Sequence, residues 1–416
     1  MNNKRPVCYA PWITRYEWST GNITPCCEWK SDDWVHGDVI KTTENMSLDD
    51  SFNHPGMENI KTQLLEADDN NIDSLPSGCL HCKILEKNGA HSHRLGLNDV
   101  VERAEKYSSY KFNPNEYKQL WLDYRESNLC NFSCKMCGTD LSSTHSKIEG
   151  LHGKTGILKS PHKLQMYLDR LDEIQHLNFL GGEPVLSDSM YIILKEARKR
   201  NLHHNMNVNI TTNGSLLHRN NDNLLELLEG FYHTNISISI DAYGEQHNYW
   251  RHKGTWDAVY NNTKEIIKWA KDQNAKGSDP DWISADVAIR TAISWPTAFA
   301  ARDTFDMVSE MGVEQRWNIV STPRGLSPKN LPKNILAALC VWWQKYPLVA
   351  EMFKNTISNP NMKELIKEKE KFFRHDAWHG NSFVETFPEF EEFYNKIPND
   401  NRFSRADVNN FYDQFN

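Results

Sequence analysis

The sequence predicts an α/β fold: a partial (β/α)6 barrel with a cysteine-rich N-terminal domain and C-terminal helices. Three observations carry this prediction. Between about residues 116 and 322, short apolar or alternating segments are separated by longer stretches with helical spacing. This alternation is typical of a parallel sheet with right-handed crossovers. Five of the nine cysteines lie in the first hundred residues, and the strand pattern stops after Pro323.

Six strands and five connecting helices follow from the hydrophobic pattern. The expected strands are Gln119–Arg125, His176–Leu180, Met206–Thr212, Asn235–Asp241, Ile283–Ile293 and Gln315–Val320. The expected helices are Leu164–Ile174, Met190–Arg200, Asn223–Gly230, Trp256–Lys271 and Phe299–Met311. Six such repeats make three-quarters of an eight-fold barrel, in which catalytic groups lie at the carboxyl ends of the strands.

Composition divides the chain into three expected domains: residues 1–115, 116–322 and 323–416. The first is polar and irregular, so we expect it to depend on bound metal rather than on an apolar core. The second is the barrel. The third is helical, with aromatic anchors such as Trp342 and Phe372.

Charge and hydropathy exclude several classes of protein. The net charge of -8 gives no general attraction to nucleic acid, so a nucleic-acid partner is not expected. The mean hydropathy of -0.68 and the lack of a long apolar run argue against a membrane protein. The first ten residues contain no apolar core of a signal peptide. We therefore expect a cytoplasmic protein whose cysteines bind metal rather than form disulfides.

A compact cysteine motif follows the first expected strand. Cys130, Cys134 and Cys137 are spaced C-x3-C-x2-C. Three thiolates can bind three irons of a cubane cluster and leave the fourth iron open, whereas a structural cluster uses four cysteines. In isolation, three cysteines could also form a zinc site or remain buried thiols.

With this motif after the first of six β–α units, residues 118–322 resemble the radical S-adenosylmethionine (radical SAM) superfamily. The resemblance implies a catalytic 4Fe–4S cluster on Cys130, Cys134 and Cys137, with S-adenosylmethionine on the open iron. One electron then cleaves the sulfonium, and a 5′-deoxyadenosyl radical removes a substrate hydrogen. A small electron donor such as flavodoxin or ferredoxin is implied. Met136 corresponds to the residue that lies against the adenine, although it could instead fill core space.

A second motif ends the second expected strand. Gly181, Gly182, Glu183 and Pro184 form a GGEP sequence. Glycines let the backbone approach a ligand closely, and Glu183 offers a carboxylate to an ammonium group. The motif resembles the family's GGE sequence, which binds the methionine amino group. By itself it is also a common turn.

Further cofactor contacts are implied at the ends of the third and fourth strands. Asn213 belongs to a TTNG sequence that resembles a family motif facing the cofactor. The alternative is that this sequence forms an ordinary turn. Ser239 and Asp241 resemble the ribose-binding strand, since small polar residues replace the apolar residues of a barrel core. Arg251 has the position of an arginine that pairs with the cofactor carboxylate. A solvated surface arginine is the alternative.

The N-terminal cysteines resemble another module of this superfamily. Cys8 and Cys26 have the spacing C-x12-G-x4-C, and Cys79 and Cys82 form a C-x2-C. The pattern resembles the start of the SPASM and twitch auxiliary-cluster domains, although here it precedes the barrel. It implies a second, auxiliary 4Fe–4S cluster on these four thiols. Cys27 could replace Cys26, and a zinc knuckle is the alternative metal site.

The sequence thus predicts a radical SAM enzyme that cleaves S-adenosylmethionine and abstracts a substrate hydrogen. A peptide or protein is the leading substrate class. A small-molecule radical dehydrogenase or epimerase is one alternative. A non-catalytic iron–sulfur or zinc protein is the other.

Overall fold

The computed structural model describes residues 4–17, 22–29, 40–41, 46–139, 141–148, 161–276, 284–359 and 361–399. Gly21, which belongs to the N-terminal cysteine spacing, and Ile283, the start of the fifth expected strand, lie outside these residues. None of the helices in the described ranges combines the length and apolar character needed to cross a bilayer.

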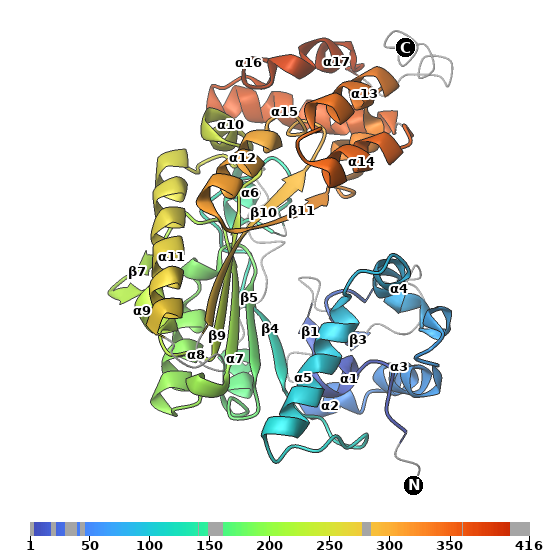
Figure 1. Ribbon diagram of the computed structural model, residues 1–416, viewed down its shortest axis with the longest axis vertical. Helices are drawn as coiled ribbons and strands as arrows, with labels where there is room; N and C mark the ends of the chain where they lie inside the picture. Colours follow the sequence, from blue (N-terminus) through green and yellow to red (C-terminus); the bar gives the residue numbers. More distant parts are fainter. Residues whose placement is uncertain are drawn as a thin grey trace.

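The centre of the molecule is a six-stranded parallel sheet (Figure 1). Its strands follow one another in chain order from one edge to the other, so each pairs with its sequence neighbours. They are β4 (Trp121–Arg125), β5 (His176–Leu180), β6 (Asn207–Thr212), β9 (His233–Ser239), β10 (Ser284–Ile293) and β11 (Glu314–Ile319). The six expected strands are confirmed, with ends displaced by at most two residues. The sheet is open, with β4 and β11 as its edges.

One face of the sheet is apolar and packs against the connecting helices. Leu122, Leu177 and Val208 lie side by side on this face and are fully buried. The helices are α7 (Pro161–Leu168), α8 (Asp188–Lys199), α9 (Leu224–Leu228), α11 (Trp256–Lys276) and α12 (Ala301–Met311). All five expected helices are present. The first is shifted, because residues 169–173 form turns instead of continuing α7.

The N-terminal part is more ordered than its composition indicates. Its helices are α1 (Ala10–Ile13), α2 (Leu48–Phe52), α3 (Pro55–Glu66), α4 (Leu80–Lys87) and α5 (His93–Tyr107). A small antiparallel sheet contains β1 (Tyr16–Glu17), β2 (Asn22–Thr24) and β3 (Ile40–Lys41). The expectation of an irregular region without a core is wrong. Apolar residues such as Ile60, Leu64, Leu97 and Val101 recur at helical spacing and are buried in one cluster with the barrel core.

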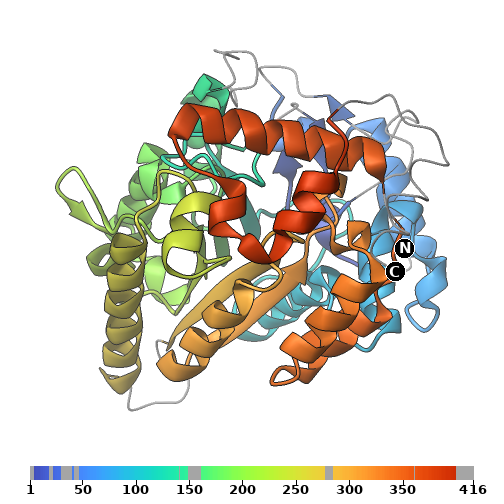
Figure 2. The same cartoon turned by 90° about the horizontal axis from the view of Figure 1, so that it is seen from above.

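The C-terminal part is helical, as expected. It contains α13 (Lys333–Trp342), α14 (Pro347–Asn355), α15 (Met362–His379), α16 (Phe383–Thr386) and α17 (Glu391–Lys396). Its aromatic residues form a second apolar cluster with Trp295, which follows β10 and lies 5.6 Å from Phe383 between ring centroids. Seen from above, α15 crosses the end of the molecule (Figure 2).

Short elements complete the barrel region: α6 (Ser143–Ile148), β7 (His218–Arg219), β8 (Asp222–Asn223) and α10 (Gly244–Trp250). The first apolar cluster runs from Val7 to Val308 without a break at residue 115. The three-domain division at residues 115 and 322 stays a prediction.

Candidate active site

The three-cysteine loop leaves the carboxyl end of β4 and is fixed by backbone pairing. Ser133 N donates to the carbonyl of His252 over 3.0 Å, and Lys135 N donates to that of Trp250 over 2.9 Å. These bonds bracket Arg251, which follows α10. Because a backbone segment paired at two points cannot slide, Arg251 has a set position beside the loop.

The three thiols are sheltered from solvent and lie within the field of Arg251. Cys130 and Cys134 are buried, and Cys137 is partly buried. Burial raises the pKa of Cys130 to about 12. The Cys134 thiol donates a hydrogen bond to Cys137, which raises the pKa of Cys134 and lowers that of Cys137. The positive charge of Arg251 opposes the rise in the pKa values of Cys130 and Cys134 and contributes to the fall in that of Cys137. A cation that stabilises three neighbouring thiolates suits a metal-binding loop.

Glu183 lies next to the loop with its carboxylate oriented by three donors. Thr212 Oγ1 donates to Oε1 over 2.7 Å, and the backbone N–H of Asn213 donates to Oε2 over 2.7 Å. The backbone N–H of Val185 donates to Oε1 over 3.2 Å. Glu183 is only 3% exposed, and burial raises its pKa although the three hydrogen bonds oppose the shift. Pro184 follows it and opens a short 3-10 helix over Pro184–Leu186.

The two glycines before Glu183 permit close packing against the start of the cysteine loop. Gly181 has φ +135°, a value that side chains disfavour. A Cβ on Gly182 would lie 2.3 Å from the carbonyl oxygen of Leu129. The Glu183 N–H donates to that same carbonyl over 2.8 Å. The glycines therefore let the GGEP segment pair with the residue just before Cys130.

Replacing Gly182 with alanine is expected to displace the cysteine loop. The clash is with backbone, which cannot rotate away, so we expect a loss of roughly 1–3 kcal/mol in the free energy of unfolding, together with lower iron content after reconstitution. Urea unfolding and iron analysis measure the two effects. Gly96→Ala is the matched control, since its Cβ meets only His91 Cε1 at 3.8 Å. Unchanged stability and iron content in Gly182→Ala would contradict this packing role.

Asn213 connects the end of β6 to the loop. Its Nδ2 donates to Asn131 Oδ1 over 2.9 Å, and its Oδ1 accepts from Ser215 N over 2.9 Å. Asn131 directly follows Cys130. Met136 is partly buried and packs against both apolar clusters. Asn213 therefore ties the end of β6 to the residue that follows Cys130.

Asp241 and Arg251 form a buried ion pair after the fourth strand. Arg251 Nη2 lies 2.8 Å from Asp241 Oδ2, and their side chains are 10% and 0% exposed. Asp241 Oδ1 accepts from the backbone N–H of Ala292 over 2.9 Å, which ties it to β10. Arg251 Nε is buried without a hydrogen-bond partner among the described residues. Ser239 ends β9 and is partly exposed. The solvated-surface alternative for Arg251 is wrong, because the side chain is enclosed.

The sequence-predicted residues thus converge from four strands. The three cysteines follow β4, Glu183 follows β5 and Asn213 follows β6. Ser239 is the last residue of β9, and Asp241 comes two residues later. Arg251 follows α10. Since carboxyl ends of parallel strands meet at one edge, the motifs form a single cluster.

Several residues that hold this cluster were not predicted from the sequence. Lys135 is fully buried, and its Nζ lies 3.5 Å from Asp376 Oδ1 in α15. Tyr249 Oη donates to the same oxygen over 2.8 Å, and Lys371 Nζ donates to the carbonyl of Cys137 over 3.0 Å. Helix α15 therefore covers the loop. A lysine between two of the cysteines was the one signal available in the sequence.

The second face of the sheet is polar where a barrel core is ordinarily apolar. Asp123, Asn178, Asn209 and Asn235 are in register on four adjacent strands and therefore share this face. Asn178 and Asn209 are partly exposed. This row offers amide and carboxylate groups below the cysteine loop.

The four N-terminal cysteines lie near one another. Cys8 and Cys82 are buried, and Cys26 and Cys79 are partly buried. Burial raises the pKa of all four, and charge interactions join Cys26 to Cys8 and Cys79, and Cys79 to Cys82. Cys27 instead places its Sγ 3.7 Å from His93 Nε2. Charge interactions also join Cys27 to Cys26 and to Cys82, so the choice of Cys26 over Cys27 as the fourth member stays a prediction.

Comparisons with known proteins bear on the barrel. No curated protein sequence matches the chain. Three structures of Streptococcus suis SuiB are among the solved structures that match the chain. The first covers 80% of this chain and 68% of SuiB, at 14% identity and a TM-score of 0.37. The SuiB structure bound to S-adenosylmethionine covers 90% of this chain and 78% of SuiB, at 14% identity and a TM-score of 0.37. The SuiB structure bound to the precursor peptide SuiA covers 85% of this chain and 74% of SuiB, at 12% identity and a TM-score of 0.35.

The family comparison matches the part of the chain that carries the site. Residues 126–278 match the family described as the radical SAM superfamily. This range contains the cysteine loop, the GGEP motif, Asn213, Asp241 and Arg251. Over residues 126–278, this chain is therefore similar to the radical SAM superfamily.

Proposed function

We propose that this chain is a radical SAM enzyme that reductively cleaves S-adenosylmethionine and abstracts a hydrogen atom from a peptide or protein. One observation carries the proposal. Three thiols after β4, a buried carboxylate after β5 and a buried guanidinium after α10 meet at the carboxyl edge of the sheet. A non-catalytic metal protein would have no use for the oriented charges beside the thiols.

The donor set fits a 4Fe–4S cluster with one open iron. Cys130, Cys134 and Cys137 would bind three irons, and Arg251 would stabilise the thiolates. When bound, the cluster supplies the electron that cleaves a carbon–sulfur bond of S-adenosylmethionine, and the adenosyl fragment takes the substrate hydrogen. The cysteine loop contributes the site for this chemistry, and α15 shields it from water.

Two charged residues would hold the methionine moiety. The Glu183 carboxylate is oriented by Thr212, Val185 and Asn213, so it can accept from an ammonium group without further movement. Arg251 uses Nη2 on Asp241 and keeps a buried Nε with no partner among the described residues. That unsatisfied donor would suit a carboxylate. Ser239, Asn213 and Met136 would contact the nucleoside. Asp241 is fully enclosed and pairs with Arg251, so it would position that arginine instead of touching the cofactor.

Substituting Glu183 with glutamine is expected to weaken cofactor binding. The amide preserves shape but removes the charge, so we expect a loss of roughly 1.5–3 kcal/mol in the binding free energy of S-adenosylmethionine. Equilibrium binding to the anaerobic, reconstituted chain measures it. The cluster should still assemble, because Glu183 is not one of its ligands. Equal affinity in Glu183→Gln and the unmodified chain would contradict this role.

We further propose an auxiliary 4Fe–4S cluster on Cys8, Cys26, Cys79 and Cys82, in a twitch-like domain. Their mutual charge interactions support a common site. A tetrahedral zinc ion with Zn–S bonds of about 2.3 Å requires sulfurs about 3.8 Å apart. In the described part of the chain, no three of these four sulfurs lie within 4.8 Å of one another. The wider spacing favours a cluster over a single zinc ion. Electrons would come from a small donor such as flavodoxin or ferredoxin.

The polar face of the sheet supports a polar substrate. Asn178 and Asn209 are partly exposed and carry both donors and acceptors, as recognition of peptide groups requires. Deuterium transfer tests the substrate class: candidate peptides labelled at carbon are incubated with the reduced chain and S-adenosylmethionine. Deuterium in 5′-deoxyadenosine supports peptide modification. Transfer from small-molecule substrates alone would contradict it and favour a dehydrogenase or epimerase.

A further inference from the structure

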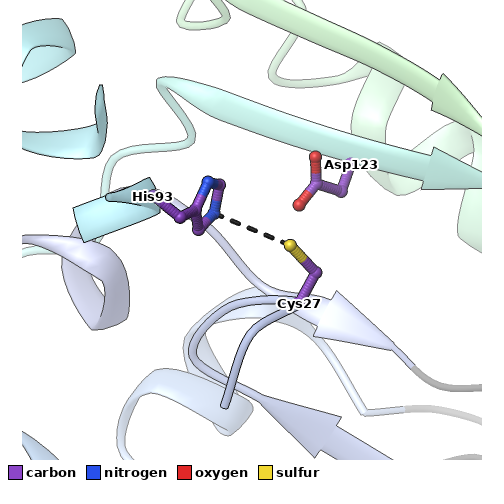
Figure 3. Close-up of side chains that lie close together, drawn as sticks. All are labelled: Cys27, His93 and Asp123. Carbon is purple, nitrogen blue, oxygen red and sulfur yellow. Dashed lines mark hydrogen bonds between the residues drawn. The ribbon is translucent and has the colours of Figure 1, made fainter. Parts of the chain in front are cut away.

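A cysteine, a histidine and an aspartate meet where the N-terminal part contacts the edge strand of the barrel (Figure 3). Cys27 follows β2, His93 is the first residue of α5, and Asp123 lies in β4. One donor atom from each lies within 4.8 Å of the other two. Cys27 Sγ and His93 Nε2 are 3.7 Å apart. The group belongs to neither of the cysteine sets described above.

The carboxylate of Asp123 is already oriented toward this point. Its side chain lies on the polar face of the sheet and is 7% exposed. Trp121 Nε1 and Asn178 Nδ2 donate to Oδ1 over 2.8 and 2.7 Å. Oδ2 is buried and has no hydrogen-bond partner among the described residues. Such support of one oxygen orients the carboxylate of a metal ligand, while a buried oxygen left without a partner is unfavourable.

The distances fit a single metal ion. With Zn–S of about 2.3 Å and Zn–N of about 2.0 Å, a tetrahedral angle puts the two donors about 3.5 Å apart. The observed 3.7 Å between Cys27 Sγ and His93 Nε2 is close to that value. A thiol–imidazole hydrogen bond explains the same distance, but it leaves Asp123 Oδ2 unsatisfied. A cation satisfies all three groups.

We propose that Cys27, His93 and Asp123 bind one zinc ion. A thiolate, an imidazole and a carboxylate are all zinc ligands, and three protein ligands leave a fourth position for water or a substrate group. The ion would link the segment after β2, the start of α5 and strand β4. It would also neutralise the negative charge of Asp123 at one end of the polar row of the sheet. The site does not depend on the radical chemistry proposed above.

X-ray absorption at the zinc edge tests the site in the full chain. The anaerobic protein is treated with chelator, loaded with zinc and freed of unbound metal, and zinc, iron and acid-labile sulfide are counted together. We expect one zinc per chain, with one sulfur neighbour and two or three nitrogen or oxygen neighbours. A shell of sulfur alone would place zinc in the four-cysteine set and overturn the proposal. Failure to bind zinc would overturn it as well.

The Asp123→Asn variant separates a metal site from a hydrogen-bonded cluster. The amide oxygen can still accept from Trp121 and Asn178, but the ligand oxygen is lost. We expect zinc affinity to fall at least tenfold, with iron and sulfide unchanged. His91→Gln is the matched control, because His91 is exposed and pairs only with Asp99 over 3.4 Å among the described residues. Equal zinc affinity in Asp123→Asn and the unmodified chain would show that the three residues form hydrogen bonds only. Retained iron and sulfide content shows that the variant is folded.

Discussion

Replacing Cys130, Cys134 and Cys137 together with alanine is expected to abolish reductive cleavage of S-adenosylmethionine. The three thiols lie at the point where Glu183 and Arg251 converge, and removing all of them leaves no ligand for the catalytic cluster. The N-terminal cysteines are unchanged, so iron content should fall by about half. Anaerobic reconstitution followed by iron, sulfide and 5′-deoxyadenosine analysis measures both effects.

Cys340→Ala is the control for the triple variant. Cys340 lies in α13 and belongs to neither cysteine set. We expect its removal to leave iron content and cleavage unchanged. Full cleavage activity in the triple variant would contradict the assignment of the catalytic loop. Complete loss of iron from the triple variant would contradict the auxiliary cluster. It would not contradict the catalytic cluster.

Arg251→Ala is expected to cause the largest loss of stability among single substitutions at the site. Arg251 and Asp241 pair at 2.8 Å, and Asp241 is completely enclosed. Removing the arginine leaves a buried carboxylate without its counter-charge, which costs roughly 3–5 kcal/mol. Urea unfolding of the chain without S-adenosylmethionine measures this loss separately from cofactor binding.

A double variant shows whether the loss comes from the ion pair. Arg251→Met combined with Asp241→Asn removes both charges, and the amide oxygen can still accept from Ala292. We expect the double variant to be clearly more stable than Arg251→Ala. Arg316→Ala, at the exposed pair with Glu314, is the control and should cost no more than about 1 kcal/mol. A double variant as unstable as Arg251→Ala would attribute the loss to packing instead.

The strands and their motifs could be predicted because their signals are local. In β9, for example, Ile236 and Ile238 alternate with Ser237 and Ser239, and the structure buries the isoleucines completely. The cysteine loop, the GGEP motif and Asn213 each come shortly after a strand. The parallel topology then brings the motifs together without any information about long-range contacts.

The N-terminal part could not be predicted in the same way. Its apolar residues are sparse, and polar residues between them obscure the helical spacing that buries Ile60 and Leu64 in α3. The Cys27, His93 and Asp123 group was missed because its members are far apart in sequence and meet only through tertiary packing. One signal existed: Asp123 is an acidic residue in the middle of β4, on the side opposite Leu122 and Tyr124.

Cleavage of S-adenosylmethionine by the reconstituted chain tests the central claim most directly. The anaerobic protein is reduced with dithionite, S-adenosylmethionine is added, and methionine and 5′-deoxyadenosine are measured over time. We predict equal amounts of the two products, formed only when the chain, the reductant and the intact Cys130, Cys134 and Cys137 are all present. A chain that assembles a 4Fe–4S cluster on these cysteines, is fully reduced and still forms no 5′-deoxyadenosine would contradict the claim.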